Sequence, residues 1–187
     1  TTLFRSRLAR VCQWQTTAKI IRAYLDVATR LIRAWGGEIR SFDGDRVMGV
    51  FIGDTPNSNA ANCAREIDYV VEKIIAPKAR EKFKSVRDND LKITHCVGID
   101  VGVARAVRAG IRNNNDLIWI GKAPAFSAKL SDVRNYPWCV YISSRSYKKL
   151  SDSAKYDGDG KDMWVGVERT VGDVKETVYK TKVIRKP

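Results

Sequence analysis

The chain has 187 residues, of which 44% are hydrophobic and 29% are charged, and this suits one globular domain with a sizeable core. Its formal net charge of +13 favours an anionic partner, such as a nucleotide, a nucleic acid or a membrane surface. No apolar run is long enough to cross a membrane, and no signal-peptide pattern opens the chain. We therefore expect a single domain over residues 1–187 with no membrane partner.

The four cysteines are widely scattered, and none forms a C-x-x-C pair: Cys12, Cys63, Cys96 and Cys139. Neither a zinc site nor a disulfide framework is indicated, so we expect reduced core thiols in a cytoplasmic protein. His95 is the only histidine and lies on a predicted strand without metal-ligand neighbours, so we expect it to be structural.

The first half of the chain predicts a helix, a hairpin and a second helix. The first predicted helix opens at Thr16-Thr17, carries apolar residues at helical spacing and ends at Gly36-Gly37. Strands at 38–42 and 46–52 flank an Asp-Gly pair, which is a strong signal for a β-hairpin. The loop at Thr55 then leads into a helix with apolar residues on one face.

The second half predicts mostly strands. The alternating segment 92–102 favours a strand, and 103–111 is a plausible partner for it, closed by a polar loop at 112–115. The apolar segment 117–120 predicts a short buried strand, and Gly121 leads into a helix. The remaining expectations are a strand at 137–142, a short helix at 144–150, and an antiparallel pair at 163–169 and 175–184. This order predicts a mixed sheet with helices on one face.

The hairpin leaves the carboxylate of Asp45 at the start of its second strand. A carboxylate fixed on a rigid strand beside a tight turn can hold a divalent cation against a triphosphate. Asp43 suits the first central position of such a turn, so we assign it to turn chemistry. The sequence therefore predicts a candidate metal ligand at Asp45.

Two motifs in the right order resemble those of a class III nucleotide cyclase domain. The first runs from Gly36-Gly37-Glu38 through a strand to Gly44-Asp45-Arg46-Val47-Met48. In the second half, Val97-Gly98-Ile99-Asp100-Val101-Gly102 is similar to the family's Gly-Ile-x-x-Gly strand, and Trp119–Leu130 to its Gly-(x)₃-Asn-x-Ala-Ala-Arg segment. The resemblance covers nearly the whole chain and implies a ferredoxin-like α/β fold, with a mostly antiparallel mixed sheet and helices packed on it.

Within that family the chain is most similar to the pyrimidine cyclases of the bacterial Pycsar anti-phage system. The phrases that carry this resemblance are Tyr24–Arg30, Ser41–Asp45 and Asn114–Gly121. The branch implies conversion of UTP or CTP into a 3′,5′-cyclic monophosphate with release of pyrophosphate. Its product would activate a partner effector protein. We favour UTP and cyclic UMP, and keep CTP and cyclic CMP as the alternative.

The resemblance also implies an active site shared between two copies of the chain. Class III cyclases hold two Mg²⁺ or Mn²⁺ ions with two Asp residues on adjacent strands, and Asp45 matches the second of these. Lys129 occupies the position of the family's transition-state Arg and offers its charge without the bidentate fork. Arg40 lies beside the position where purine cyclases place a base-reading Lys, and Lys122 could contact phosphate. Trp119 is expected in the core or in the dimer interface.

Two departures from the family keep other interpretations open. Counting back from Asp45 to the other metal Asp reaches Thr1, and residues 1–14 contain no carboxylate. Either the strand that carries this Asp lies upstream of Thr1 and the first strand is truncated, or the site is degenerate. Ala125 replaces the family's Asn, which could cost roughly 2–4 kcal/mol of barrier.

The rival interpretations are therefore a cyclase-fold module that binds a nucleotide without turnover and a basic nucleic-acid-binding domain. The chain lacks the aromatic-rich strand of an RNA-recognition motif, so we expect no nucleic-acid partner.

Overall fold

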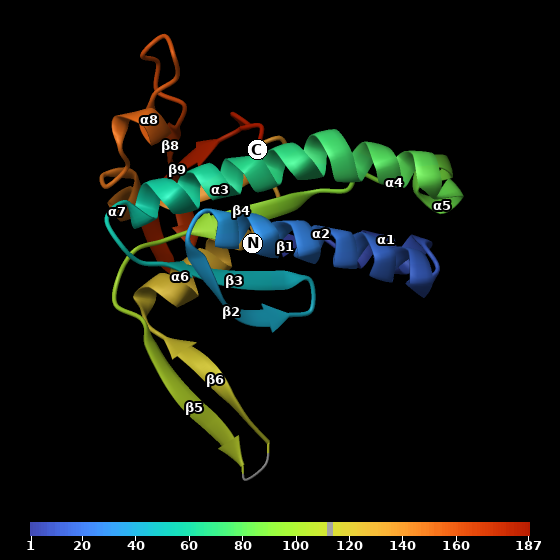
Figure 1. Ribbon diagram of the computed structural model, residues 1–187, viewed down its shortest axis with the longest axis horizontal. Helices are drawn as coiled ribbons and strands as arrows, with labels where there is room; N and C mark the ends of the chain where they lie inside the picture. The colour runs from blue at the N-terminus through green and yellow to red at the C-terminus, as the bar shows by residue number, and fades with distance from the viewer. Residues whose placement is uncertain (112–113) are drawn as a thin grey trace.

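The computed structural model of the protein describes residues 1–111 and 114–187. Its main sheet has seven strands in the order β2-β3-β1-β4-β7-β9-β8 (Figure 1). Strands β4 and β7 run parallel and the other pairs are antiparallel. The strands are β1 (Thr2–Leu3), β2 (Gly37–Asp43), β3 (Arg46–Phe51), β4 (His95–Ile99), β7 (Val140–Ser143), β8 (Val165–Val171) and β9 (Val174–Thr181). The order β2-β3-β1-β4 is that of a ferredoxin-like β-α-β-β-α-β unit, so this expectation is confirmed.

Two long helical segments follow the predicted pattern. The first begins at Trp14, two residues before the predicted start, and α3 continues through a π-helical turn at Val71–Ile75 into α4. The helices are α1 (Ser6–Val11), α2 (Trp14–Ala34), α3 (Pro56–Val70), α4 (Ala76–Lys82), α5 (Lys84–Asp88), α6 (Lys122–Ser131), α7 (Ser144–Tyr147) and α8 (Asp152–Lys155). None of the helices in the described ranges has the length and apolarity needed to cross a membrane.

Helices cover both faces of the sheet, so the prediction of helices on one face is wrong. Alternation along β4 shows why: Val97 packs in a cluster with Ala61 and Ala64 of α3, whereas Cys96 packs with residues of α6 on the other side. Close contact with α6 requires a glycine at position 98, because a Cβ atom there would lie 2.1 Å from the carbonyl oxygen of Ser127. The sequence predicted helix α6 but not the face of the sheet that it covers.

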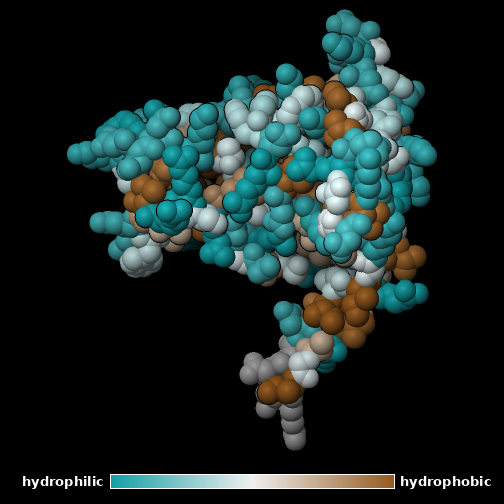
Figure 2. All heavy atoms as spheres, turned by 180° about the vertical axis from the view of Figure 1, so that it is seen from behind, coloured by the Kyte–Doolittle hydropathy of each residue, from teal (hydrophilic) through white to brown (hydrophobic). Residues whose placement is uncertain are grey.

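A separate two-stranded arm projects from the domain (Figure 1). Strands β5 (Arg105–Ile111) and β6 (Asn114–Ile120) pair with each other, so the predicted pairing of 103–111 with the strand at 92–102 is wrong. The segment 117–120, predicted to be buried, instead exposes Leu117, Ile118 and Ile120, and Figure 2 shows hydrophobic side chains gathered along the arm. An apolar run looks the same in sequence whether its own chain covers it or not. Residues 112–113 of the predicted polar loop lie outside the described residues.

The last two strands confirm the predicted closing pair. Strands β8 and β9 form an antiparallel ladder from Val165↔Lys180 to Val171↔Val174. Glycine at position 172 adopts φ +65° in the turn between them. This turn lies close to α6, which matters for the lysines of that helix.

Candidate functional site

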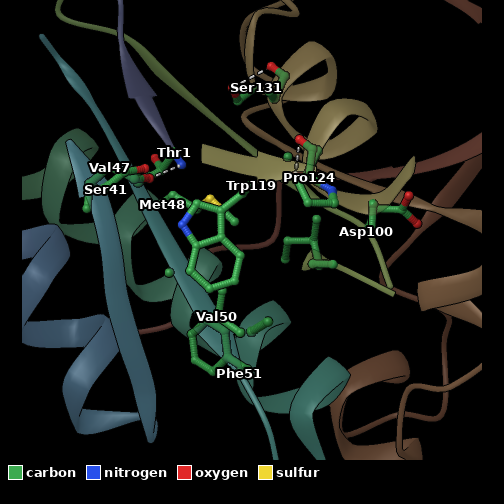
Figure 3. A pocket seen from close by; sticks show the side chains of 18 of the residues that line it. Thr1, Ser41, Val47, Met48, Val50, Phe51, Asp100, Trp119, Pro124 and Ser131 are labelled. Carbon is green, nitrogen blue, oxygen red and sulfur yellow. Dashed lines mark hydrogen bonds between the residues drawn. The ribbon is translucent and has the colours of Figure 1, made fainter. Parts of the chain in front are cut away.

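A cavity of about 940 Å³ opens beside the central strands of the sheet (Figure 3). Its walls are β3, the end of β4, the end of β6 and the inner side of α6, and most of the side chains in it are apolar. Around it lie Met48 of β3, Asp100 directly after β4, Trp119 of β6 and Pro124 of α6. The volume suits a nucleotide-sized ligand.

The cavity coincides with a slot in the sheet. Strand β1 lies between β3 and β4, and Thr2 pairs with both Arg46 and Cys96. The amino group of Thr1 donates to the carbonyl oxygen of Val47 over 2.9 Å and extends that ladder by one step. Beyond Thr1, no described strand separates β3 from β4. Their facing edges therefore present unpaired backbone groups, the arrangement that accepts an added strand.

The β2–β3 hairpin forms as predicted, but its turn is shifted by one residue: Asp45 lies in the turn instead of at the start of the second strand, and Asp43 ends β2 instead of lying in the turn. Asp43 pairs with Arg46, and Gly44 takes φ +58° between them, so Gly44 and Asp45 form the tight turn. The Asp45 carboxylate accepts a hydrogen bond from Nε of Arg5 over 2.8 Å, and its side chain is 14% exposed. A cation already lies against this carboxylate, as expected for a group that attracts positive charge.

A smaller cavity of about 170 Å³ surrounds Asp45. It is lined by residues of both charge signs: Arg5, Arg46 and Arg134, with Asp43, Asp45 and Asp132. Asp43 and Arg46 also line the larger cavity, so the two cavities meet at the hairpin. Carboxylate oxygens are the ligands that Mg²⁺ and Mn²⁺ prefer, so the residues here fit a divalent cation.

Both predicted lysines of α6 are exposed and line neither cavity. Lys129 reaches the turn between β8 and β9, where a Cβ atom on Gly172 would lie 2.2 Å from its Nζ. Lys122 pairs with Glu176 over 3.0 Å. The structure therefore does not bring Lys129 to Asp45 within one chain, whereas Ala125 of the same helix does line the larger cavity.

Arg40 is exposed on β2 and contacts Trp119 rather than the core. Its guanidinium carbon lies 5.7 Å from the centroid of the Trp119 ring, and it also pairs with Glu38. Trp119 itself lines the larger cavity (Figure 3), although we expected it in the core or a dimer interface. The local sequence did not predict that Trp119 lines a cavity, because this position depends on how the arm packs relative to the sheet.

Asp100 is a cavity-lining residue to which the sequence assigned no role. It follows β4, its side chain is fully buried, and Arg145 binds it through Nε at 2.9 Å and Nη2 at 2.6 Å. Ser143 and the amide of Val101 also donate to it. This hydrogen bonding to Asp100 raises the pKa of Arg145 above its ordinary value. Its position in the Gly-Ile-x-x-Gly motif was the available signal.

His95 lies in a buried polar cluster away from both cavities. Its Nε2 is 2.9 Å from Oδ1 of Asp68, and Cys139 completes a group whose ligand atoms lie within 4.8 Å of one another. The expectation that His95 lacks metal-ligating neighbours is thus wrong in space, because α3 and β7 bring them to it. Burial raises the pKa of the Cys139 thiol, which keeps the thiol protonated and disfavours metal binding.

The likeness to solved structures defines the class of fold. A bacterial light-regulated adenylyl cyclase matches with a TM-score of 0.78 and 19% identity, over 99% of this chain and 50% of that chain. The guanylate cyclase domain of RhGC from Catenaria anguillulae, solved in complex with GTP, matches with a TM-score of 0.72 and 15% identity, over 98% of this chain and 93% of that chain. The protein has the class III nucleotide cyclase fold. No family model matches the chain.

Curated relatives identify the family. A uridylate cyclase of Rhodovulum sp. (strain MB263) is 40% identical over 183 residues, which is 97% of this chain and 76% of the relative. Uridylate cyclases of Burkholderia cepacia and Xanthomonas perforans are 42% and 39% identical, over 81% and 79% of this chain. The chain spans 63% and 61% of their respective lengths. The chain belongs to the uridylate cyclase family of nucleotide cyclases.

Proposed function

We propose that the protein converts UTP into 3′,5′-cyclic UMP and pyrophosphate. The observation that carries this proposal is the placement of Asp45 beside a nucleotide-sized cavity, in a chain whose relatives are uridylate cyclases. In the reaction, the ribose 3′ oxygen attacks the α-phosphorus in line and pyrophosphate leaves. Cyclic CMP from CTP is the alternative product.

The acidic residues of the smaller cavity would hold a divalent cation, Mg²⁺ or Mn²⁺. Asp45 is the proposed ligand, and Arg5, which pairs with it, would move aside. Bound there, cations would lower the charge barrier at the attacking and leaving oxygens. The basic side chains of the same cavity would face the triphosphate.

We propose that the working unit is a homodimer with shared sites. Lys129 reaches the β8–β9 turn of its own chain, so it would meet a substrate at Asp45 only from a second copy. Its charge would then stabilise the transferred phosphoryl group, and a monomer would be inactive. Arg40 and Lys122 are proposed to contact the substrate. The exposed apolar arm, including Val107 and Leu117, supports a dimer because such a patch favours burial against a partner.

Shared sites can be tested by mixing two inactive variants. Asp45→Ala and Lys129→Ala each damage both sites of a homodimer, but a mixed dimer regains one site with both residues intact. Recovery of activity on mixing supports the shared site, and persistent inactivity of the mixture, with heterodimers verified by mass spectrometry, would contradict it.

We propose that the first metal carboxylate lies on a continuation of β1 before Thr1. The slot between β3 and β4 supports this, because a residue before Thr1, in the observed register, would face Met48 and Gly98. That places it one strand away from the Asp45 hairpin. The rival is a degenerate module that binds nucleotide without turnover, which Ala125 favours.

The proposed activity is tested with the full-length protein, the four ribonucleoside triphosphates and Mn²⁺, with products resolved by chromatography. We expect cyclic UMP, which should disappear in Asp45→Ala and persist in Asp26→Ala, a matched change in an exposed carboxylate on α2. Cyclic CMP would favour the alternative substrate. Nucleotide binding without any product would favour the degenerate module.

We propose further that the product acts in the cytoplasm as an anti-phage signal to an effector protein. The four buried free cysteines fit a reducing compartment. Phage should form fewer plaques on cells that carry the intact gene with its neighbouring genes than on cells that carry the Asp45→Ala variant. Equal plaque counts would contradict the anti-phage role while leaving the cyclase activity untouched.

A further inference from the structure

The indole ring of Trp119 forms one wall of the larger cavity. It lies among Met48 and Val50 of β3 and Ser41 of β2, with its nitrogen directed toward the side of Ser41 and Thr1 (Figure 3). Its Nε1 is buried, and among the described residues it has no hydrogen-bond partner. A buried N–H group without an acceptor is unfavourable, so one that lines a ligand-sized cavity points to an acceptor on the ligand.

Arg40 contacts this indole from outside the cavity. The guanidinium of Arg40 lies over its ring at 5.7 Å from the centroid, a distance at which the cation is attracted to the π-system. Trp119 also pairs with Ala106 in the ladder of the arm. These contacts favour one orientation of the ring, and a donor with a preferred orientation can select a ligand by its geometry.

The surroundings of the nitrogen suit a planar base. The lining of the larger cavity is largely apolar, with Ser41 and Thr1 as polar residues on the side of the nitrogen, and a flat ring between apolar walls needs only a few polar groups to orient it. An indole nitrogen can donate a hydrogen bond but cannot accept one. It therefore pairs with a ring carbonyl and rejects an amino group in the same place.

We propose that Nε1 of Trp119 donates a hydrogen bond to the carbonyl at position 4 of the pyrimidine base and so selects uracil over cytosine, which has an amino group there. This inference rests on the proposed function and deepens it by naming a specificity-determining residue. A site that hydrogen-bonds one substrate group discriminates strongly against an analogue that leaves the site unpaired.

Titration calorimetry on the full-length protein tests the inference, with UTP, CTP and inorganic tripolyphosphate as ligands. Trp119→Phe keeps an aromatic ring and removes the N–H. We expect it to weaken UTP binding about tenfold and to leave CTP and tripolyphosphate binding nearly unchanged. Trp138→Phe is the matched control, because Trp138 packs against Lys180 and Lys182 and lines neither cavity.

The outcomes separate this inference from the proposed function. An unchanged UTP affinity in Trp119→Phe, or an equal loss for UTP and CTP, overturns the role of Trp119 but not the cyclase. A loss for tripolyphosphate as large as that for UTP also overturns it, because the change would then be structural. Failure of the unsubstituted protein to bind UTP would overturn the proposed function together with the inference.

Discussion

Two carboxylates beside the cavities have opposite surroundings. Asp45 is partly exposed and accepts from one residue, Arg5, through its exposed side chain at 2.8 Å and its backbone amide at 3.4 Å. Asp100 is fully buried and accepts from Arg145, Ser143 and a backbone amide. A carboxylate with one exposed partner can exchange it for a metal ion, whereas a fully satisfied one stabilises the fold. The two aspartates therefore suit different tasks.

Removal of Arg5 should favour cation binding at Asp45. In Arg5→Ala the carboxylate loses its competing cation, so Mn²⁺ affinity in the absence of nucleotide should rise a few-fold. Stability should change by less than about 1 kcal/mol, because the pair is exposed on the Arg5 side. Electron paramagnetic resonance of free Mn²⁺ measures the affinity, and Arg7→Ala in the adjoining helix α1 is the control. A weaker Mn²⁺ affinity in Arg5→Ala would contradict the assignment of Asp45 as a ligand.

Removal of Arg145 should instead lower the free energy of unfolding. Arg145→Ala leaves the buried charge of Asp100 without its ion-pair partner, which costs about 3–5 kcal/mol in comparable sites. The surface pair of Arg30 with Asp26 provides the control, because Arg30→Ala should cost less than about 0.5 kcal/mol. Urea unfolding compares both variants with the unsubstituted chain. Equal losses would mean that Asp100 is solvated in solution.

At the scale of elements, the packing of α6 on β4 sets where the second half of the site lies. Helix α6 carries Lys122 and Lys129 on its exposed side and Ala125 toward the larger cavity. Its distance from the sheet is set by Gly98, which leaves room for the backbone of residues 127 and 131. A shift of α6 would therefore move all three positions together.

Gly98→Ala should disrupt this packing. The added Cβ would lie 2.1 Å from the Ser127 carbonyl oxygen and 2.6 Å from the Ser131 amide nitrogen, so the helix must move. Overpacking of this kind costs about 1–3 kcal/mol. Gly158→Ala is the control, because nothing lies within 4 Å of a Cβ atom there. Thermal unfolding of the two variants should differ clearly, and matching midpoints would show that α6 is loosely packed.

The sequence predicted elements better than it predicted their surroundings. Periodicity identified α2, the β2–β3 hairpin and the β8–β9 pair, because one buried face leaves a pattern in the chain itself. It misplaced α6 and the arm, because an apolar run such as 117–120 does not show which surface covers it. Asp45 carried a local turn signal, whereas Trp119 and Asp100 acquire their roles only where β6, β3 and β4 meet.

At the scale of the molecule, well-buried side chains form the core, whereas the surfaces around the candidate site are exposed. Three clusters of buried side chains pack against the sheet. They include Cys12, Cys63 and Cys96, and the fourth cysteine, Cys139, is also buried. The slot between β3 and β4 and the apolar arm are two surfaces that these clusters do not cover. Both are surfaces where further polypeptide would add buried area. Both surfaces border the larger cavity, beside which catalysis is proposed.

The buried thiols should make the protein less stable in alkaline solution. Burial raises the pKa of Cys63 and of Cys96 from 9.0 to about 12, and raises that of Cys139 as well. In the unfolded chain these thiols ionise near pH 9, whereas in the folded chain they keep their protons. Above pH 9 the unfolded state therefore binds fewer protons, and the free energy of unfolding should fall by up to about 1.4 kcal/mol per pH unit for each thiol.

Urea unfolding at several pH values between 8 and 10.5 measures this decline. The slope should be near zero at the lower end of that range and become steeper above pH 9. Cys63→Ala removes one of the three thiols, so its stability should fall less steeply with pH even though the variant starts from a lower value, because a cavity replaces the sulfur. Identical slopes in the variant and the unsubstituted chain would mean that Cys63 titrates normally in the folded state, and therefore that water reaches the core between α3 and the sheet.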